Sequence, residues 1–405
     1  MPGHITEQPG SLTAPSGFMA AGVSCGLKRT GKPDLGLLVS KAPCASAELY
    51  TPNAAAAAPI RICRQKAQSG AIQGIVANSG TANACTGGRG LDAAGEMTSQ
   101  AAGLCGLPPA GMAVASTGVI GMQLDMNLVS SGIATAAAAL SESGGAAFAE
   151  AIKTTDRLDK QGAVAVKLPA GEVRIGACAK GAGMIAPNMA TMLAFMTTDA
   201  GAAPELLKEV LGRAAASSFN SISVDGDMST NDCVFLLANG ESGVQLRQDS
   251  RDAALFAEAV AAVCKSLALK MVADGEGASK LVEFRVTGAA SQEEADRVAR
   301  SVAGSPLVRT AFYGGDANWG RIMASAGAAL AGAPELKADI FYEDTCLARA
   351  GEAVAESINQ KRLAQIMSQA EISVAMVLHR GSSAQTVYFS DLTHDYVTLN
   401  AEYTS

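Results

Sequence analysis

The chain has 405 residues, enough for one large domain or for two to three of ordinary size. Hydrophobic residues make up 48% of it and can fill a sizeable core, whereas aromatic residues make up only 4%. The net charge is -7 and no basic run is present. This argues against a nucleic-acid binder, because neutralising phosphates requires clustered Lys and Arg.

The abundance of Ala and Gly predicts an interior of small side chains with tight helix-on-sheet contacts. The longest run of small apolar residues, Ala54 to Ala58, is too short to span a membrane, and the start of the chain lacks a signal-peptide pattern. The nine cysteines contain no C-x-x-C pair and their number is odd, which supports neither a disulfide framework nor a zinc site. We therefore expect a cytoplasmic protein with mostly buried thiols and no metal.

In chain order, residues 1–16 are polar and contain Pro and Gly, so we expect a disordered arm there. Beyond the arm, short apolar runs alternate with longer helical patterns, which predicts an α/β or α+β fold. The Ser291-x-x-Glu294 capping box opens one amphipathic helix. A boundary near 301–306 predicts a smaller sub-domain over residues 306–405. The clearest strands are expected at 71–77, 112–115, 163–168, 233–238 and 281–286, and the clearest helices at 204–217 and 251–273.

Two familiar catalytic patterns fail. Residues 26–32 have the spacing of a phosphate-binding loop, but Pro33 stands where a magnesium-binding Ser or Thr is required, so we interpret the segment as a surface turn. The three histidines are His4, His379 and His394, and none accompanies a nucleophile elbow or an H-E-x-x-H motif. If the protein is a hydrolase or a transferase, its base is therefore not expected to be histidine.

Residues 180–199, KGAGMIAPNMATMLAFMTTD, allow two interpretations. In the first, a Gly-rich turn leads into a buried apolar element whose hydroxyl groups satisfy local backbone groups, and residue types alone favour it. In the second, the bond after Ala190 is broken and the freed α-amine of Thr191, with an ordinary pKa of about 8, becomes the base for its own hydroxyl. A Gly-rich approach would let the scissile bond distort.

This segment is similar to the self-cleavage segment of the ornithine acetyltransferases, also called glutamate N-acetyltransferases. The similarity extends over nearly the whole chain. Other segments that resemble the family are GKPDL at 31–35, NSGTANACTG at 78–87, ASTGVIG at 115–121, VDGDMSTND at 224–232, DGEG at 274–277, NWGR at 318–321 and NAEYTS at 400–405. The resemblance implies a layered αββα sandwich with a smaller C-terminal α/β portion.

The resemblance also implies self-processing and a reaction. Family members cleave themselves before the threonine, which here separates Ala190 from Thr191. An α chain of residues 17–190 and a β chain of residues 191–405 would stay associated, in an α2β2 heterotetramer. The Thr191 hydroxyl would take the acetyl group of N-acetylornithine and pass it to glutamate by ping-pong chemistry, which regenerates ornithine in arginine biosynthesis. Whether acetyl-CoA also donates stays open, and no other cofactor is implied.

Thr117 and Gly118 match the oxyanion-hole pair of the family, although turn chemistry alone would make them a Ser/Thr-Gly turn after a strand. By charge, Lys180 is the natural partner of a substrate carboxylate and Glu276 of an ammonium group. The positions that match substrate ligands of the family are Thr154 or Thr155, Lys180, Thr191, Glu276, Asn400 and Ser405.

The chain departs from the family pattern at a few positions, and these leave the exact substrate open. Lys153 stands where methionine is expected, Ala317 stands where proline is expected, and Ala54 to Ala58 replaces a more varied polar stretch. A specialised relative acting on an ornithine-like metabolite would keep the same nucleophile. The same residues are also compatible with a self-processing threonine amidohydrolase or aminopeptidase, or with a binding protein on an enzyme-like fold.

Overall fold

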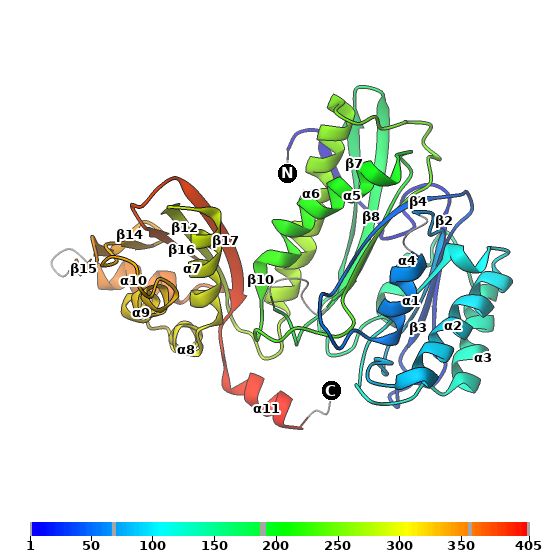
Figure 1. The fold of residues 1–405 in the computed structure, drawn as a ribbon, viewed down its shortest axis with the longest axis horizontal. Coiled ribbons are helices and arrows are strands. Elements are labelled where there is room, and N and C mark those ends of the chain that lie inside the picture. The colour runs from blue at the N-terminus through cyan, green and yellow to red at the C-terminus, as the bar shows by residue number, and fades with distance from the viewer. Residues whose placement is uncertain (1, 67–69, 187–191, 355–358, 403–405) are drawn as a thin grey trace.

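The computed structural model describes residues 2–66, 70–186, 192–354 and 359–402. Within these ranges the chain forms three β-sheets and the helices that cover them (Figure 1). Two of the sheets build an N-terminal sandwich, and the third builds a separate C-terminal portion. The expected α/β class is therefore confirmed.

The sandwich contains a six-stranded sheet of order β1-β7-β8-β9-β11-β4 and a four-stranded sheet of order β2-β3-β5-β6. The strands of the first are β1 Ile5–Gln8, β4 Ala45–Tyr50, β7 Lys160–Leu168, β8 Gly171–Lys180, β9 Leu193–Thr198 and β11 Cys233–Ala238. The strands of the second are β2 Phe18–Val23, β3 Leu35–Ser40, β5 Gly74–Asn78 and β6 Met112–Ser116.

The two sheets pack face to face between helical layers. Along β9, Leu193 and Phe195 belong to the core shared with the four-stranded sheet, whereas Ala194 and Met196 belong to the core under α5 and α6. This alternation is the period-two pattern of a strand buried on both faces. The helices of the outer layers are α1 Ala58–Lys66, α2 Gly87–Leu104 and α3 Met126–Ala138 on one side, and α5 Pro204–Ala216 and α6 Arg251–Ala273 on the other. The αββα sandwich is therefore confirmed.

The C-terminal portion is built on a seven-stranded sheet of order β10-β17-β12-β16-β13-β14-β15 with its own apolar core. Figure 1 shows α11, His394–Glu402, leaving this portion and running back toward the sandwich. The other strands are β10 Ile222–Ser223, β12 Leu281–Ala289, β13 Asp339–Tyr342, β14 Thr345–Arg349, β15 Glu352–Ala353, β16 Glu371–Val377 and β17 Ser383–Ser390. The other helices are α7 Gln292–Gly304, α8 Pro306–Tyr313, α9 Trp319–Ala329 and α10 Gln360–Met367.

The predicted boundary near 301–306 is wrong. Strand β12 begins at Leu281 and pairs with β16 and β17, so the C-terminal portion starts well before residue 301. Only Ser305 separates α7 from α8. The Gly- and Pro-containing stretch at 301–306 is the end of α7 and the start of α8 inside this portion, and Pro306 occupies the first position of α8.

The prediction of a disordered arm over residues 1–16 is also wrong where these residues form a strand. Strand β1 forms an antiparallel ladder with β7, in which Ile5 is opposite Val166. Leu12 is fully buried, and the Thr197 hydroxyl donates a hydrogen bond to the Leu12 carbonyl at 2.6 Å. Backbone pairing at a sheet edge orders this polar segment, and composition does not report it.

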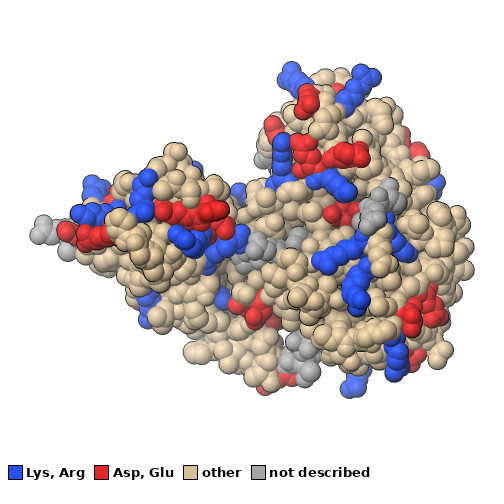
Figure 2. Space-filling model, viewed as in Figure 1, with Lys and Arg blue, Asp and Glu red and all other residues tan. Residues whose placement is uncertain are grey.

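The surface and the thiols agree with the composition. On the face shown in Figure 2, Lys and Arg side chains are interspersed with Asp and Glu. All nine cysteines are free, and five of them are buried. No helix within the described residues has the length and apolar character that crossing a membrane requires.

Small residues let helices approach the sheets closely, as the composition predicts. Helix α4, Gly145–Ala151, lies against β2 and β3. A Cβ atom on Gly22 of β2 would lie 1.9 Å from the Ala147 carbonyl oxygen of α4. Backbone meets backbone at this point, so no side-chain rotation can relieve the clash.

We therefore expect Gly22→Ala to lower the free energy of unfolding by about 2 kcal/mol or more, because α4 must move off the sheet. Gly95→Ala is the matched control, since Gly95 lies inside α2 and its Cβ would have no atom within 4 Å. Alanine is the better helix former there, so this variant should gain up to about 1 kcal/mol. Thermal unfolding followed by circular dichroism compares the two, and equal midpoints would contradict the close-packing account.

Candidate active site

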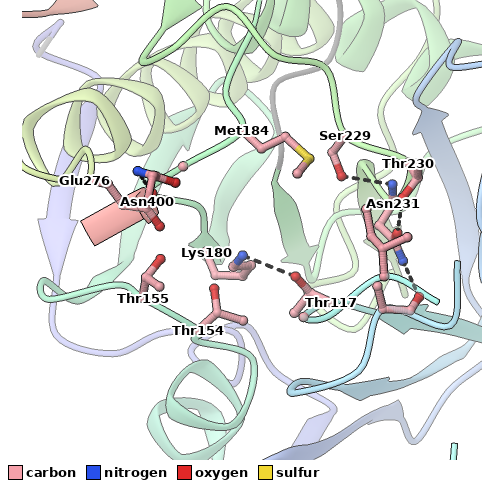
Figure 3. Close-up of a pocket in the computed structure, with 14 residues that line it drawn as sticks. Thr117, Thr154, Thr155, Lys180, Met184, Ser229, Thr230, Asn231, Glu276 and Asn400 are labelled. Carbon is pink, nitrogen blue, oxygen red and sulfur yellow. Dashed lines mark hydrogen bonds between the residues drawn. The ribbon is translucent and has the colours of Figure 1, made fainter. Parts of the chain in front are cut away.

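A pocket with an empty volume of about 610 Å³, its open mouth included, lies where the sandwich meets α11. It brings together seven predicted site residues from five separate parts of the chain (Figure 3): Thr117, Gly118, Thr154, Thr155, Lys180, Glu276 and Asn400. The predicted residues Ala190, Thr191 and Ser405 lie outside the described residues.

The predicted oxyanion pair follows β6 directly. The Thr117 N–H donates to the Asn78 carbonyl at 3.0 Å, which holds this turn against the end of β5. Gly118 has φ of +130°, a conformation that strongly favours glycine. A Cβ there would lie 2.3 Å from the Gly80 carbonyl carbon. Both the backbone conformation and the close contact with Gly80 therefore require glycine at position 118. The backbone of the turn is held in one conformation.

Lys180 ends β8 and points into the pocket (Figure 3). Its Nζ donates to the Thr117 hydroxyl oxygen at 3.2 Å, and the residue is only 3% exposed. Burial lowers the pKa of Lys180, while the nearby negative charge of Asp156 acts in the opposite direction. An ammonium group has three N–H donors, so this side chain can hold Thr117 and also bind an anionic substrate group.

The loop between α4 and β7 carries Thr154, Thr155 and a buried carboxylate, Asp156. One Asp156 oxygen accepts from the Gly181 N–H at 2.8 Å and from Lys160 Nζ at 2.6 Å. The other accepts from the Thr154 N–H at 3.0 Å. Burial alone would raise the pKa of Asp156, but the positive charges of Lys180 and Lys160 outweigh it and hold the pKa well below its usual range.

The opposite wall combines Glu276 with the C-terminal helix. The Asn400 side-chain amide donates to a Glu276 oxygen at 3.0 Å, and the Glu276 N–H donates to the Ala182 carbonyl at 2.8 Å. Gly277, with φ of +67°, lets α11 approach closely, because a Cβ there would lie 2.3 Å from the Tyr396 nitrogen. This wall presents a carboxylate oxygen and a side-chain amide oxygen, and both are acceptors that suit an ammonium-bearing ligand.

Sequence reasoning assigned no role to the third wall, formed by Ser229, Thr230 and Asn231. Asn231 is buried, and its amide donates to the Ala82 carbonyl at 2.7 Å and to the Ser116 carbonyl at 2.8 Å. It thereby ties the loop between β10 and β11 to the strand end before Thr117. The available signal was the dense polar segment 224–232 before a fully apolar strand.

The same loop holds the chain on both sides of residues 187–191. Asp225 accepts from the Met184 N–H at 2.6 Å and from the Ile185 N–H at 2.8 Å. Asp232, fully buried, accepts from the Met192 N–H at 3.1 Å. Burial raises the pKa of Asp225 to about 6 and raises that of Asp232 well above its usual range. Two carboxylates of one loop therefore anchor both flanks of the predicted cleavage segment.

The two segments that share features of familiar catalytic patterns make other contacts in the structure. The Asp34 carboxylate accepts from the backbone N–H groups of Cys25, Gly26 and Lys28 at 2.7, 3.1 and 2.9 Å, so these donors hold the chain's own carboxylate rather than a phosphate. His379 pairs with Asp339, and neither His379 nor His394 lines the pocket. Across the described ranges, no group of three or more His, Cys, Asp or Glu side chains is arranged to hold a metal.

Asp156→Asn should destabilise the protein by about 3 kcal/mol near neutral pH, because it removes the buried negative charge beside Lys180 and one of the two carboxylate partners of Lys160. A carboxyl with a lowered pKa in the folded state adds stability above its unfolded pKa of about 4, and this stability is lost as the pH falls further. The difference between wild type and variant should therefore shrink between about pH 4 and pH 2. Urea unfolding across this range measures it. The exposed control Asp159→Asn should change stability little, and a pH-independent difference for Asp156→Asn would contradict this account.

Comparison with known proteins shows the family of this chain. Residues 19–405 match the sequence model of the ArgJ family. The chain is 48% identical to the arginine biosynthesis bifunctional protein ArgJ of Symbiobacterium thermophilum, over 97% of this chain and 98% of that protein. It is 44% identical to the ArgJ protein of Geobacter sulfurreducens, over 96% and 98% of the two chains. A solved ArgJ structure from Bacillus halodurans matches with 40% identity and a TM-score of 0.43, covering 46% of this chain and 98% of that one. This chain therefore belongs to the ArgJ family.

Proposed function

We propose that this chain is a self-processing acetyltransferase that moves the acetyl group of N2-acetyl-L-ornithine to L-glutamate. The observation that carries the proposal is the convergence of Thr117, Gly118, Lys180 and Glu276 on one pocket, beside the anchored flank of the predicted cleavage segment. The relatives are named as arginine biosynthesis proteins, which supports substrates of this class.

The charges of the pocket fit such substrates. Acetylornithine carries a carboxylate and a side-chain ammonium, and glutamate carries two carboxylates and an α-amine. Lys180 supplies the cation for a carboxylate, and Glu276 with Asn400 supplies acceptors for an ammonium group. One of Thr154 and Thr155 adds a hydroxyl group beside Lys180.

In the proposed first half-reaction, the Thr191 hydroxyl oxygen attacks the acetyl carbonyl, and the freed α-amine of Thr191 takes the hydroxyl proton. The tetrahedral oxyanion is stabilised by donors at Thr117 and Gly118. The bond from the acetyl carbon to the ornithine nitrogen then breaks, and the proton passes to that nitrogen. Ornithine departs, and an acetyl ester remains on Thr191. In the second half-reaction, the glutamate amine attacks this ester and Thr191 regains its proton.

Interleaving of the strands supports the association of the two chains after cleavage. A cut before Thr191 would leave β8 in one chain and β9 in the other, yet these strands pair along Ile175–Lys180 and Leu193–Thr198. Strand β4 of the first chain also pairs with β11 of the second. Separating the chains would break both ladders and open the sandwich core. We extend the proposal to an α2β2 assembly in the cytoplasm, a reducing compartment that suits nine free thiols.

A second activity, acetylation of glutamate from acetyl-CoA, is included in the proposal because the relatives are named bifunctional. It would use the same ester on Thr191, since only the leaving group changes. The molecule that accepts the acetyl group distinguishes both transferase activities from a hydrolase, in which water is the acceptor. Release of free acetate that exceeds transfer in the presence of glutamate would favour an amidohydrolase instead.

Thr191→Ala should abolish both cleavage and transfer, because the variant lacks the hydroxyl nucleophile. Denaturing electrophoresis with intact-mass measurement should give fragments 1–190 and 191–405 for wild type and one whole chain for the variant. Thr398→Ala, an exposed hydroxyl on α11, serves as the control that still cleaves. A wild type that stays whole yet transfers acetyl groups would sink the mechanism.

Thr117→Val keeps the size of the side chain but removes a pocket hydroxyl. If that hydroxyl helps to stabilise the oxyanion, kcat should fall by roughly 100- to 1,000-fold. Thr135→Val on the exposed face of α3 is the matched control and should leave kcat near wild type. Steady-state kinetics on cleaved protein with N-acetylornithine and glutamate measures kcat, and a kcat within a few-fold of wild type would remove Thr117 from the oxyanion hole.

A further inference from the structure

A buried ion network lies against the pocket, and no step of the proposed reaction uses it. It consists of Asp156, Lys160 and Asp274, whose side chains are 1%, 0% and 0% exposed. Lys160 Nζ is the centre of the network, because it donates to a carboxylate oxygen of each aspartate. Burying three charges is costly unless each is paired, and an apolar side chain would fill the same space at a lower desolvation cost.

The network reaches both charged residues of the pocket. Through Asp156 it contacts the Gly181 N–H, next to Lys180. Asp274 accepts from the N–H groups of Arg157 and Leu158 at 3.0 and 3.1 Å, and it lies two residues before Glu276. A single lysine thus connects the strand end that carries the pocket cation with the turn that carries the pocket anion.

Asp156 is a counter-ion of Lys180 that does not capture its ammonium group. Both Asp156 oxygens are engaged by other donors, namely Lys160, Gly181 and Thr154. The hydrogen bond of Lys180 Nζ goes to the Thr117 hydroxyl instead. Burial lowers the pKa of Lys180, the Asp156 charge raises it, and the Lys160 charge lowers it again. Lys160 therefore shares the negative charge of Asp156 that would otherwise act on Lys180 alone.

We propose that Lys160 is a specificity-determining positioning residue: by saturating Asp156, it leaves the Lys180 ammonium free to bind the α-carboxylate of the substrate. Without Lys160, Asp156 would turn to Lys180, withdraw its ammonium from the pocket and break its bond to Thr117. The protein would then lose much of its preference for substrates that carry a carboxylate. This inference rests on the proposed function, because it assigns the carboxylate of the proposed substrate to Lys180.

The test compares N-acetylornithine with its α-carboxamide analogue as acetyl donors for wild type and Lys160→Met. Methionine keeps the length of the side chain and removes its charge. For the acid, kcat/KM should fall by about tenfold or more, mainly through KM, since a hydrogen bond to a charged group is lost. For the amide, kcat/KM should change little, so the acid-to-amide ratio should fall by about the same factor. Equal losses for the two donors, with the ratio unchanged, would show a merely structural role and overturn the proposal.

Two further variants keep the test decisive. Lys167→Met makes the same change at an exposed position of the same strand, β7, and should leave the ratio at its wild-type value. The single variant leaves the Asp274 carboxylate without its lysine, which can prevent folding. The double variant Lys160→Met with Asp274→Asn avoids this, because it removes one charge of each sign. Its acid-to-amide ratio should fall as well, because Asp156 still loses its lysine, and an unchanged ratio overturns the proposal. A wild type that transfers from neither donor refutes the proposed function instead.

Discussion

The pairing of β8 with β9 is the constraint on which the rest of the site depends. In this antiparallel ladder Lys180 lies opposite Leu193, so the last residue of one strand and the first residue of the next meet at one end of the sheet. The ladder continues for six residues on each strand and is buried on both faces. It places the pocket cation and the strand that follows the proposed cleavage point at the same sheet end, so a cut between them would leave the ladder itself intact.

Charge balance governs what this sheet end can bind. Lys180 is buried, yet its counter-ion Asp156 is occupied by other donors, and Glu276 faces it across the pocket. A ligand with separated positive and negative groups would complete both pairings at once. Asp225 and Asp232 hold the backbone that leads into and out of residues 187–191. The proposed binding and processing steps would therefore share one scaffold.

Sequence patterns predicted those parts of the fold whose signal is local. The helix at Arg251–Ala273 and the strand at Cys233–Ala238 were predicted at their observed bounds. The Ser291 hydroxyl does cap α7 by accepting from the Glu294 N–H, although Glu294 reaches back to the Ala290 N–H rather than to that of Ser291. Strand β1 and the true start of the C-terminal portion were missed, because both depend on pairing with strands far along the chain.

The residues of the pocket could be predicted from the sequence, but the contacts that hold them in place could not. No periodicity or spacing would have selected Thr117, Lys180 and Glu276; the resemblance to a family identified them. The structure brings these three residues into one pocket. Neither composition nor motif could show that Lys160 bridges Asp156 and Asp274, because Asp274 is distant in sequence and a lysine is usually solvated.

The most direct test of the account is a search for the acetyl ester. Cleaved protein would be incubated with N-acetylornithine without an acceptor, denatured in acid and analysed by peptide mass spectrometry. The account predicts one acetyl group on the peptide that begins at Thr191, and its loss on addition of glutamate. Rapid acetyl transfer with no acetyl group on that peptide, or with the group on a different residue, would contradict it.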